Sequence, residues 1–514
     1  MSQPTRSVVI VGGGTAGWIT AGRIAAKHRS HAEDGLRVTL IESPTIGTVG
    51  VGEGTWPTMR STLKKIGISE SDFIRECDAT FKQGAKFARW VTGRDDDFYY
   101  HPLVLPQGFQ TVNLPAYWQE RREQQSFSAA VCHQEHICEH GLAPKQITTP
   151  EYGAVANYAY HLNAGKFAEF LKRYCVEKLG VNLLLDDVIA VNAKENGDIA
   201  SVATAKNGDV GGDLFIDCTG FSSLLLGKHL GVPFIDKSDV LFIDNALAVQ
   251  VPYDHEDAPI ACNTISTGQD AGWIWDIGLQ HRRGVGYVYS SHHTSHEQAE
   301  QTLRNYVGPA IDALSPRKIP IRSGHRQLFW KNNCVAVGLS AGFLEPLEAS
   351  AIVLVELSAE MIAEQLPPCR EVMDVMAKRF NETFLYRWDR IIDFLKLHYM
   401  LSQRTDNDFW EDNRRPQSIP ESLRELIALW RYRPPGNHDF TSNNEVFPAA
   451  SYQYILYGMG FKTDTRYLAH TLVEQDLAEE QFSRNARAIR QALATLPKHR
   501  DLLKKVHLYG FQAL

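Results

Sequence analysis

A strand, a glycine-rich turn and a helix follow one another at the amino terminus, and this order constrains the fold more than any other feature. Residues 8–11 are β-branched throughout, which is typical of a strand buried on both faces. Residues 12–17 fit the pattern G-x-G-x-x-G, and residues 16–27 are rich in Ala and Ile, as in a helix. A second apolar strand, 36–41, ends at Glu42. The pattern favours a dinucleotide-binding α/β module over a tight turn in an unrelated α/β core.

The residues of this turn suit a nucleotide. Glycines let the backbone approach a pyrophosphate, the helix amino terminus attracts its charge, and an acidic residue after the second strand suits a ribose hydroxyl. The predicted contacts are Gly12, Gly14, Thr15, Ala16, Gly17 and Glu42.

FAD fits the rest of the chain better than NAD. Two later strand-to-turn segments, 216–220 and 334–338, resemble the short second segments that flavoproteins place near the dinucleotide, which adds Gly338 to the predicted contacts. No second G-x-G-x-x-G is present for a nicotinamide cofactor. We therefore expect an FAD protein that receives its electrons through another protein.

Composition excludes several classes of function. The net charge is −7, and the sequence has no basic footprint for nucleic acid. No apolar run approaches the roughly 18 residues of a membrane span, and no signal-peptide pattern opens the chain. The eight cysteines are scattered without a C-x-x-C pair, which favours reduced thiols. We expect a soluble cytoplasmic protein without nucleic-acid or membrane partners.

Strands and helices alternate up to about residue 365, and a helix-rich tail follows. The predicted fold class is α/β, with a Rossmann-like FAD-binding module interleaved with a substrate β-sheet domain and a helical carboxyl-terminal part. The expected domains are residues 1–370, which hold the module and the sheet, and residues 371–514, which cover the substrate.

Residues 272–278 read Gly-Trp-Ile-Trp-Asp-Ile-Gly. On a strand, Trp273 and Trp275 point to the same side, and we expect the two indoles to stack into a rigid apolar wall. Such a wall is ordinary core in many proteins. Beside a flavin site it can also keep something apart from the cofactor.

Two histidine-rich stretches invite a metal interpretation. His136 to His140 fits H-x-x-E-H, a zinc-peptidase pattern, but the sequence shows no clear downstream ligand, so we expect a polar helix or loop and no metal. The second stretch contains His292, His293 and His296. Ser295 and Gln298 in the same segment predict a capping box at a helix start.

Several segments match one known family, in the same order along nearly the whole chain. They are 12–18, 51–57, 81–87, 100–102, 272–275, 286–290, 345–348, 393–394 and 398–399. On these segments the chain resembles the flavin-dependent halogenases of the tryptophan halogenase family. The resemblance implies that reduced FAD, oxygen and halide give hypohalous acid, which reaches a lysine beside an aromatic substrate. It also implies a separate flavin reductase.

The resemblance implies two catalytic residues. Lys82, in an apolar or small setting, matches the family lysine that holds the oxidant by proximity, and partial burial would favour its neutral amine. The alternative interpretation of Lys82 is an ordinary surface lysine, and Lys86, four residues on, is the residue that could be mistaken for it. Glu348 matches the glutamate that polarises the oxidant or removes the arene proton. The apolar run 351–357 places Glu348 at the start of a buried helix, where an acid is ordinarily a capping residue.

Backbone amides of Ser350 and Ala351 would hold the halide, since a helix start is a natural anion site. The family usually has Ser-Thr-Gly in this stretch, so no chloride preference is transferred, and bromide is the safer expectation. Trp273 and Trp275 match the residues thought to screen flavin from substrate. Gly278 replaces the last proline of that pattern, which we expect to loosen a turn.

Val51, Gly52 and Glu53 fall in a loop that resembles the family's flavin strap. The candidate substrate residues are His101, Pro102, Leu103, Tyr452 and Tyr454. The clamp for free tryptophan is not recognisable, so an indole, tryptophan or another electron-rich arene, including one attached to something larger, fits equally well. The sequence leaves open the regiochemistry and the oligomeric state, a homodimer being one option.

Two alternatives stay open at this point. A flavin-dependent aromatic hydroxylase would need an open route from flavin to substrate, and a non-catalytic FAD-binding homologue would need no catalytic residues.

Overall fold

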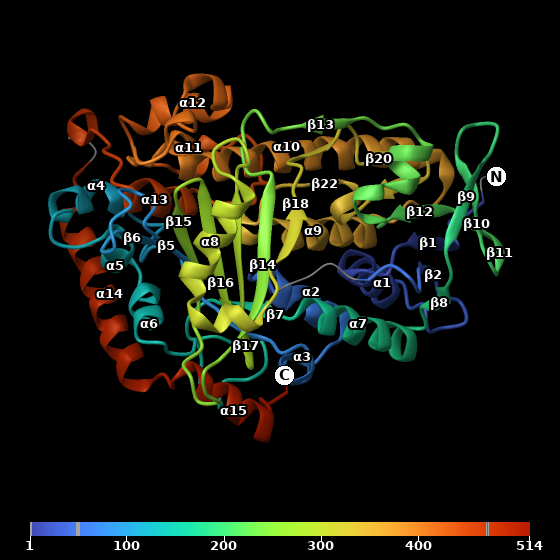
Figure 1. The fold of residues 1–514 in the computed structure, drawn as a ribbon, viewed down its shortest axis with the longest axis horizontal. Helices are drawn as coiled ribbons and strands as arrows, with labels where there is room; N and C mark the ends of the chain where they lie inside the picture. Colours follow the sequence, from blue (N-terminus) through green and yellow to red (C-terminus); the bar gives the residue numbers. More distant parts are fainter. Residues whose placement is uncertain (1–2, 48–51, 469, 471, 514) are drawn as a thin grey trace. The chain divides into compact units, whose positions relative to one another are not determined.

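The computed structural model describes residues 3–47, 52–468, 470 and 472–513, and the chain divides into two compact units (Figure 1). Unit 1 comprises Met1–Ala79, Leu162–Lys237 and Arg322–Trp388, and unit 2 comprises Thr80–His161, Ser238–Ile321 and Asp389–Leu514. Each unit is assembled from three separate segments, which confirms an interleaved α/β fold with a helical carboxyl-terminal part. The domain boundary at residue 370 stays a prediction.

Unit 1 is built on a six-stranded sheet, parallel except at one edge, whose strands β12, β1, β2 and β8 run side by side in Figure 1. Its core strand β1 buries Val8, Val9 and Ile10, each at most 1% exposed, as a strand covered on both faces should. In sheet order the strands are β20 (Trp330–Lys331), β21 (Cys334–Ala336), β12 (Leu214–Asp217), β1 (Ser7–Val11), β2 (Arg37–Glu42) and β8 (Asn182–Leu185).

Helices cover this sheet. Helix α1 packs against α7 and α9 and buries Trp18, Ile19 and Ile24. The helices are α1 (Thr15–Lys27), α2 (Thr58–Ile66), α3 (Glu70–Glu76), α7 (Ala164–Leu179) and α9 (Ser350–Glu364). Two small antiparallel sheets accompany them: β9 (Val188–Ala193), β10 (Ile199–Thr204) and β11 (Gly208–Gly211), and β13 (Phe234–Asp236), β19 (Gly324–Arg326) and β22 (Gly342–Phe343).

Unit 2 is built on a seven-stranded, mostly antiparallel sheet that contains the tryptophan pair in β16. In order, its strands are β18 (Arg317–Pro320), β14 (Asn245–Pro252), β17 (Arg282–Tyr289), β16 (Gly272–Gly278), β15 (Thr264–Gln269), β5 (Gly84–Ala88) and β6 (Phe98–Pro102). In a further, three-stranded sheet, β4 (Thr80–Lys82) is an edge strand and pairs antiparallel with β7 (Ala159–Leu162).

Short helices and the helical carboxyl-terminal part complete unit 2. They are α4 (Leu114–Trp118), α5 (Phe127–Val131), α6 (Gln134–Glu139), α8 (His296–Val307), α11 (Asp408–Asp412), α12 (Glu421–Trp430), α13 (Ala449–Gly458), α14 (Gln475–Thr495) and α15 (His499–Tyr509). Helix α10 (Met373–Met400) begins in the last segment of unit 1 and ends in unit 2.

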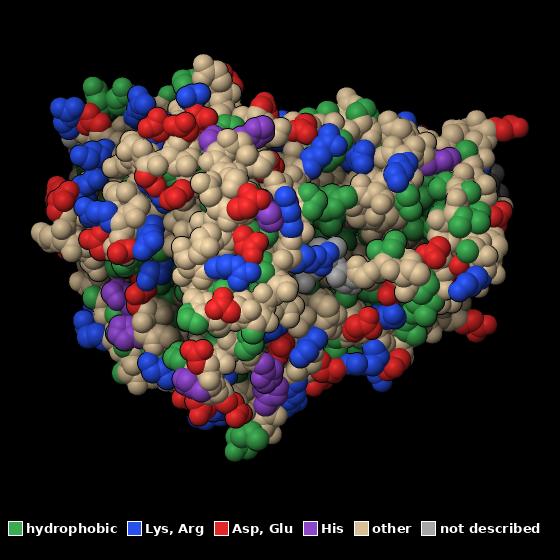
Figure 2. Space-filling view, viewed as in Figure 1, with side chains coloured by type: hydrophobic (Ala, Val, Ile, Leu, Met, Phe, Trp, Pro, Cys, Tyr) green, Lys and Arg blue, Asp and Glu red, His purple; other side chains and the backbone are tan. Residues whose placement is uncertain are grey.

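The surface carries charges of both signs, and the cysteines form no disulfide in the described residues. Figure 2 shows basic and acidic side chains interspersed on one face, as a net charge of −7 with both signs abundant would give. No helix in the described part of the chain combines the length and apolar character that a bilayer crossing requires. All eight cysteines are unpaired thiols, and seven of them are buried.

Candidate active site

Three turns meet in unit 1 at the carboxyl ends of β1, β12 and β21. At Gly12, where φ is +116°, a Cβ atom would lie 2.1 Å from the carbonyl oxygen of Cys218. At Gly338, where φ is +75°, it would lie 2.7 Å from Cβ of Ala16. Neither Gly12 nor Gly338 can be replaced by a residue with a side chain without a clash, so backbone atoms form the surface of the turns at these two positions.

Helix α1 starts where a phosphate-binding helix should. Gly14 is its N-cap and provides no capping side chain, and a Cβ atom there would meet no other atom within 4 Å. The first amides of a helix lack partners within the helix and carry the positive end of its dipole. The open space before Thr15, Ala16 and Gly17 is thus suited to an anion.

Glu42 supplies an acceptor at the end of β2. Its Oε1 atom pairs with Nζ of Lys172 at 3.1 Å, while its buried Oε2 atom has no hydrogen-bond partner. A backbone cradle beside an unpaired carboxylate oxygen fits the pyrophosphate and ribose of FAD. These residues would hold the dinucleotide part of the cofactor.

Asp217, which the sequence reasoning did not single out, organises the middle turn. Its carboxylate accepts hydrogen bonds from the backbone N–H groups of Thr219, Leu225 and Leu226 at 2.8–3.0 Å, and the residue is fully buried. The acid in segment 216–220 therefore holds the turn. In the sequence, the position of Asp217 at the end of a predicted strand was the one sign of this role.

The strap is only partly described. Val51 lies outside the described residues, and Gly52 precedes β3 (Glu53–Gly54). Loss of hydration raises the pKa of Glu53 to about 7, although the residue keeps some exposed surface.

Glu348 lies before α9 and not in its first turn. It sits in a short 3-10 turn with a left-handed backbone (φ +61°), and Ala349 is also left-handed (φ +54°). Its carbonyl oxygen accepts a hydrogen bond from Nε1 of Trp56 at 2.7 Å. Glu348 is 8% exposed, so its carboxyl belongs to the interior of unit 1.

Ser350 and Ala351 are the first two residues of α9. The backbone changes from left-handed at Ala349 to right-handed at Ser350, a geometry that turns successive N–H groups toward one point. The predicted halide ligands therefore lie at a helix start with the backbone shape of an anion site.

Lys82 ends strand β4 of unit 2 and is 3% exposed. It is close enough to His161 for its charge to lower the pKa of that buried imidazole, after the larger effect of burial. Lys86 has different surroundings from Lys82, because its ammonium pairs with Glu139 at 2.6 Å and lies over the Phe98 ring. The structure thus distinguishes the buried Lys82 from the half-buried, ion-paired Lys86.

Trp273 and Trp275 are buried on one face of β16, 1% and 8% exposed. Their ring centroids are 6.5 Å apart with planes at 65°, so the indoles meet edge to face, and the expected stacking is wrong. Edge-to-face contact brings the positive ring edge to the negative ring face, which favours it over a sandwich. Gly278 is the last residue of β16, and its carbonyl oxygen accepts a hydrogen bond from Oγ1 of Thr80 at 2.6 Å; the expected loosening of the turn stays a prediction.

The predicted substrate residue His101 lies in an aromatic cluster of unit 2. Its Nε2 atom is 2.9 Å from Oγ of Ser451, and its ring lies 5.6 Å from Phe394 and 6.3 Å from Tyr454. Phe447, absent from the sequence prediction, stacks on Phe394 at 3.8 Å. Phe394 was marked only by a short motif, and nothing in the local pattern marked Phe447.

The other candidates take separate places around this cluster. Tyr452 packs against Phe394 at 4.9 Å, and Tyr454 donates to the carbonyl oxygen of Val104 at 2.9 Å. Pro102 is buried at the end of β6. Leu103 is held by its backbone, since its N–H donates to Oε1 of Gln134 at 2.7 Å.

The histidine stretches have structural roles. Nδ1 of His140 is 2.8 Å from the carbonyl oxygen of His136, at the end of α6. Across the described residues, no group of three potential ligands that could hold a metal ion is found. Ser295 and Gln298 form the capping box of α8, which confirms that prediction.

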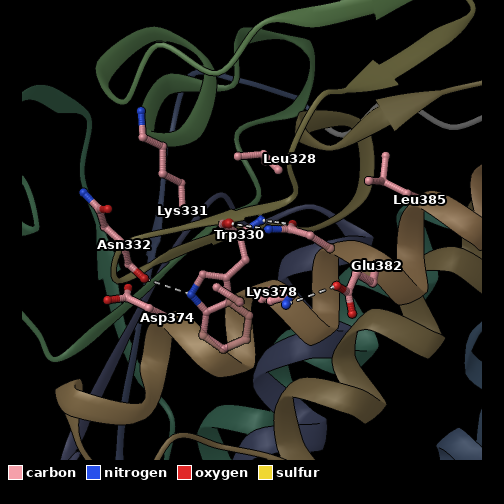
Figure 3. Close-up of a pocket in the computed structure, with 10 residues that line it drawn as sticks. Leu328, Trp330, Lys331, Asn332, Asp374, Lys378, Glu382 and Leu385 are labelled. Carbon is pink, nitrogen blue, oxygen red and sulfur yellow. Dashed lines mark hydrogen bonds and ion pairs between the residues drawn. The ribbon is translucent and has the colours of Figure 1, made fainter.

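A surface groove of about 390 Å³ lies between α10 and the loop before β21 (Figure 3). Asn381 is one of its lining residues and accepts hydrogen bonds from the N–H groups of Phe329 and Trp330. Lys378 and Glu382, which also line it, form an ion pair. None of the predicted cofactor, halide or substrate residues lines it. The groove is therefore separate from the candidate site.

Comparison with known proteins gives one consistent family. The tryptophan halogenase family model matches residues 7–474. A 7-chloro-L-tryptophan 6-halogenase from Kutzneria sp. (strain 744) is 35% identical, over 97% of this chain and 99% of its own. The crystal structure of a tryptophan halogenase from Shewanella frigidimarina NCIMB 400 superposes with a TM-score of 0.96 at 50% identity, covering 100% and 99% of the two chains. A tryptophan 6-halogenase structure from Streptomyces toxytricini gives 0.89 at 35%, covering 97% and 99%.

Proposed function

The chain belongs to the tryptophan halogenase family, whose members are flavin-dependent enzymes, and we propose that it halogenates an electron-rich aromatic ring of the tryptophan or indole type. The observation that carries this proposal is Lys82, a lysine that is 3% exposed on a short strand fixed by its neighbours. Burying an ammonium-bearing side chain is costly. Because Lys145 and Lys396 are buried as well, it is burial together with the match to the family lysine that supports a role for Lys82.

The residues of the unit 1 turns would hold FAD, with Glu42 on the ribose and Gly52 and Glu53 toward the flavin. When bound and reduced, FAD supplies the electrons with which oxygen and a halide give hypohalous acid. The amides of Ser350 and Ala351 are proposed to hold the halide, for which both bromide and chloride are candidates. The change of backbone hand at Ala349 and Ser350 supports this assignment.

Lys82 is proposed to keep the oxidant from diffusing away. Its amine can donate a hydrogen bond to the oxygen of hypohalous acid, or take up the halogen as a haloamine with release of water. The halogen then bonds to the arene carbon, and Glu348 takes the proton that this carbon loses. The net change is replacement of one ring hydrogen by halogen, with water formed from the hypohalous oxygen.

Further residues would surround the reacting groups. Trp273 and Trp275 would screen the substrate from the flavin, and His101, Pro102, Leu103, Tyr452 and Tyr454 would border the arene. The helical part 371–514 would cover it. A separate flavin reductase in the cytoplasm would supply reduced FAD.

The test is a coupled reaction with FAD, a flavin reductase, NADH, oxygen and bromide, offered tryptophan and indole in parallel. We expect a monobrominated product by mass spectrometry. The same mixture without halide tests the hydroxylase alternative, which predicts an oxygenated product there. Flavin oxidation without any modified arene, over a panel of indoles and phenols, would favour the non-catalytic alternative.

A further inference from the structure

The carboxyl-terminal helix α15 reaches the strand that carries Lys82. Strand β4 is the last strand of its sheet, so backbone N–H groups on its outer edge need acceptors from elsewhere. The N–H of Phe81 donates to Nε2 of His499 at 3.0 Å, across 418 positions of sequence. An imidazole thus takes the place that a neighbouring strand would have.

This contact fixes the tautomer of His499. Because Nε2 accepts, the ring proton is on Nδ1, which lies 3.2 Å from the carbonyl oxygen of Ile260 and donates to it. The residue is 1% exposed, and burial lowers the pKa of its imidazole to about 4. His499 is therefore neutral near neutral pH, with its single donor and single acceptor both used.

The peptide units on either side of this contact are also held. Oγ1 of Thr80 donates to the carbonyl oxygen of Gly278 at 2.6 Å, and the N–H of Gln83 donates to the carbonyl oxygen of Cys262 at 2.7 Å. Lys82 lies between the positions anchored by His499 and by Cys262. Three hydrogen bonds, one of them accepted by the carboxyl-terminal helix, therefore help to hold the strand that carries Lys82.

Apolar contacts strengthen the same connection. The ring of Phe81 lies 5.9 Å from the His499 ring, 5.1 Å from Tyr158 and 6.4 Å from Phe511. The segment after α15 is also held by a hydrogen bond, which the N–H of Glu151 donates to the carbonyl oxygen of Gln512 at 2.9 Å. These contacts lie beyond residue 474, where the family model ends.

We infer that His499 is a positioning residue for the Lys82 amine, acting through the backbone of Phe81. The inference rests on the proposed role of Lys82. Without an acceptor, the buried Phe81 N–H is left unpaired, at a cost of about 1–3 kcal/mol in place, so β4 moves to find one. A displacement of about 1 Å at a reacting group can lower a rate about a hundredfold.

Two variants, each with an amide in place of the imidazole, test whether the hydrogen bond from Phe81 matters or whether any polar side chain at residue 499 suffices. The amide of a glutamine reaches the place of Nε2 and can accept from Phe81, whereas that of an asparagine reaches only the place of Nδ1. The variants are His499→Gln and His499→Asn, with His507→Asn as control, because His507 on the same helix contacts Gln280 at 2.6 Å. The measurements are brominated product per flavin oxidised, with a scavenger of free hypohalous acid present, and kcat and KM for the arene.

The expected result is that His499→Asn loses about tenfold or more in product per flavin and in kcat, with KM for the arene within about twofold, while the scavenger captures the escaping oxidant. His499→Gln and His507→Asn stay near the wild type. Equal behaviour of the Gln and Asn variants, whether both are active or both fail, overturns the inference. Unchanged bromination by Lys82→Ala would instead contradict the proposed function, which this separate variant tests.

Discussion

The indole of Trp275 occupies the space that any side chain on residue 286 would need. The two residues face each other on the neighbouring strands β16 and β17, and a Cβ atom on Gly286 would lie 2.1 Å from both Cη2 and Cζ2 of the indole. One strand therefore supplies the tryptophan wall and the other supplies the gap that accepts it.

Gly286→Ala should destabilise the protein by about 1–3 kcal/mol, because the added methyl forces the indole out of a well-packed position. Urea unfolding and near-ultraviolet circular dichroism measure the loss and the displaced indole. The smaller ring of Trp275→Phe leaves room for the methyl, so the double variant should lose less than the sum of the two single losses. Additive losses, or a Gly286→Ala variant as stable as the wild type, would contradict this packing.

The Trp275–Gly286 pair also shows what sequence patterns could and could not give. The strand and the common face of Trp273 and Trp275 follow from alternation, which is local. The ring geometry does not, since it depends on Gly286 and on Trp90, whose ring lies 6.2 Å from Trp273. The contact of Gly278 with Thr80 is also invisible to local patterns, since the two residues are nearly two hundred positions apart.

Glu42→Ala should weaken FAD binding by about 1.5–3 kcal/mol, roughly tenfold to more than a hundredfold in Kd, because a charged acceptor for a ribose hydroxyl is lost. Titration of the apoprotein with FAD, followed by flavin fluorescence, gives the Kd. Lys172→Ala is the matched control, since Lys172 occupies only the Oε1 atom of Glu42. If the two variants bind FAD alike, the assignment of Glu42 to the ribose fails.

Glu356 makes stability depend on pH in the direction opposite to most carboxylates. It is buried in α9, accepts from Oγ1 of Thr62 at 2.6 Å, and burial raises its pKa from 4.5 to about 8. Between these values the folded state holds a proton that the unfolded state releases. Stability is therefore lost as the pH rises, by up to ~1.4 kcal/mol per pH unit from this group.

Glu356→Gln removes this titration while keeping the size of the side chain. Urea unfolding at about pH 6 and about pH 8 should show the variant gaining on the wild type as the pH rises. Glu364→Gln, at the end of the same helix, should not, because Lys27 pairs with Glu364 and holds the pKa of that carboxyl below its usual value. If the stability of Glu356→Gln relative to that of the wild type stays the same at both pH values, Glu356 is ionised in the fold and the account of its pKa fails.

The cofactor half of the site was more predictable than the substrate half. Gly12, Glu42 and their strands lie within one stretch of about forty residues, where strand, turn and helix follow one another. The surroundings of His101 come from α10, α13 and the loop before it, which meet only in the folded chain, so Phe447 and Ser451 could not be found from local patterns. Asp217 and His499 both contact backbone groups, so the sequence offered only the position of Asp217 at a strand end as a signal, and no local pattern marked His499.

The central claim is that Lys82 carries the oxidant to the arene, and bromination in the presence of a scavenger of free hypohalous acid tests it most directly. Lys86→Ala, which removes the surface lysine paired with Glu139, should keep the wild-type yield of brominated indole per flavin oxidised. Lys82→Ala should lose about a hundredfold or more while flavin oxidation continues, because the oxidant is then released to the scavenger. Wild-type bromination by Lys82→Ala under these conditions would contradict the account.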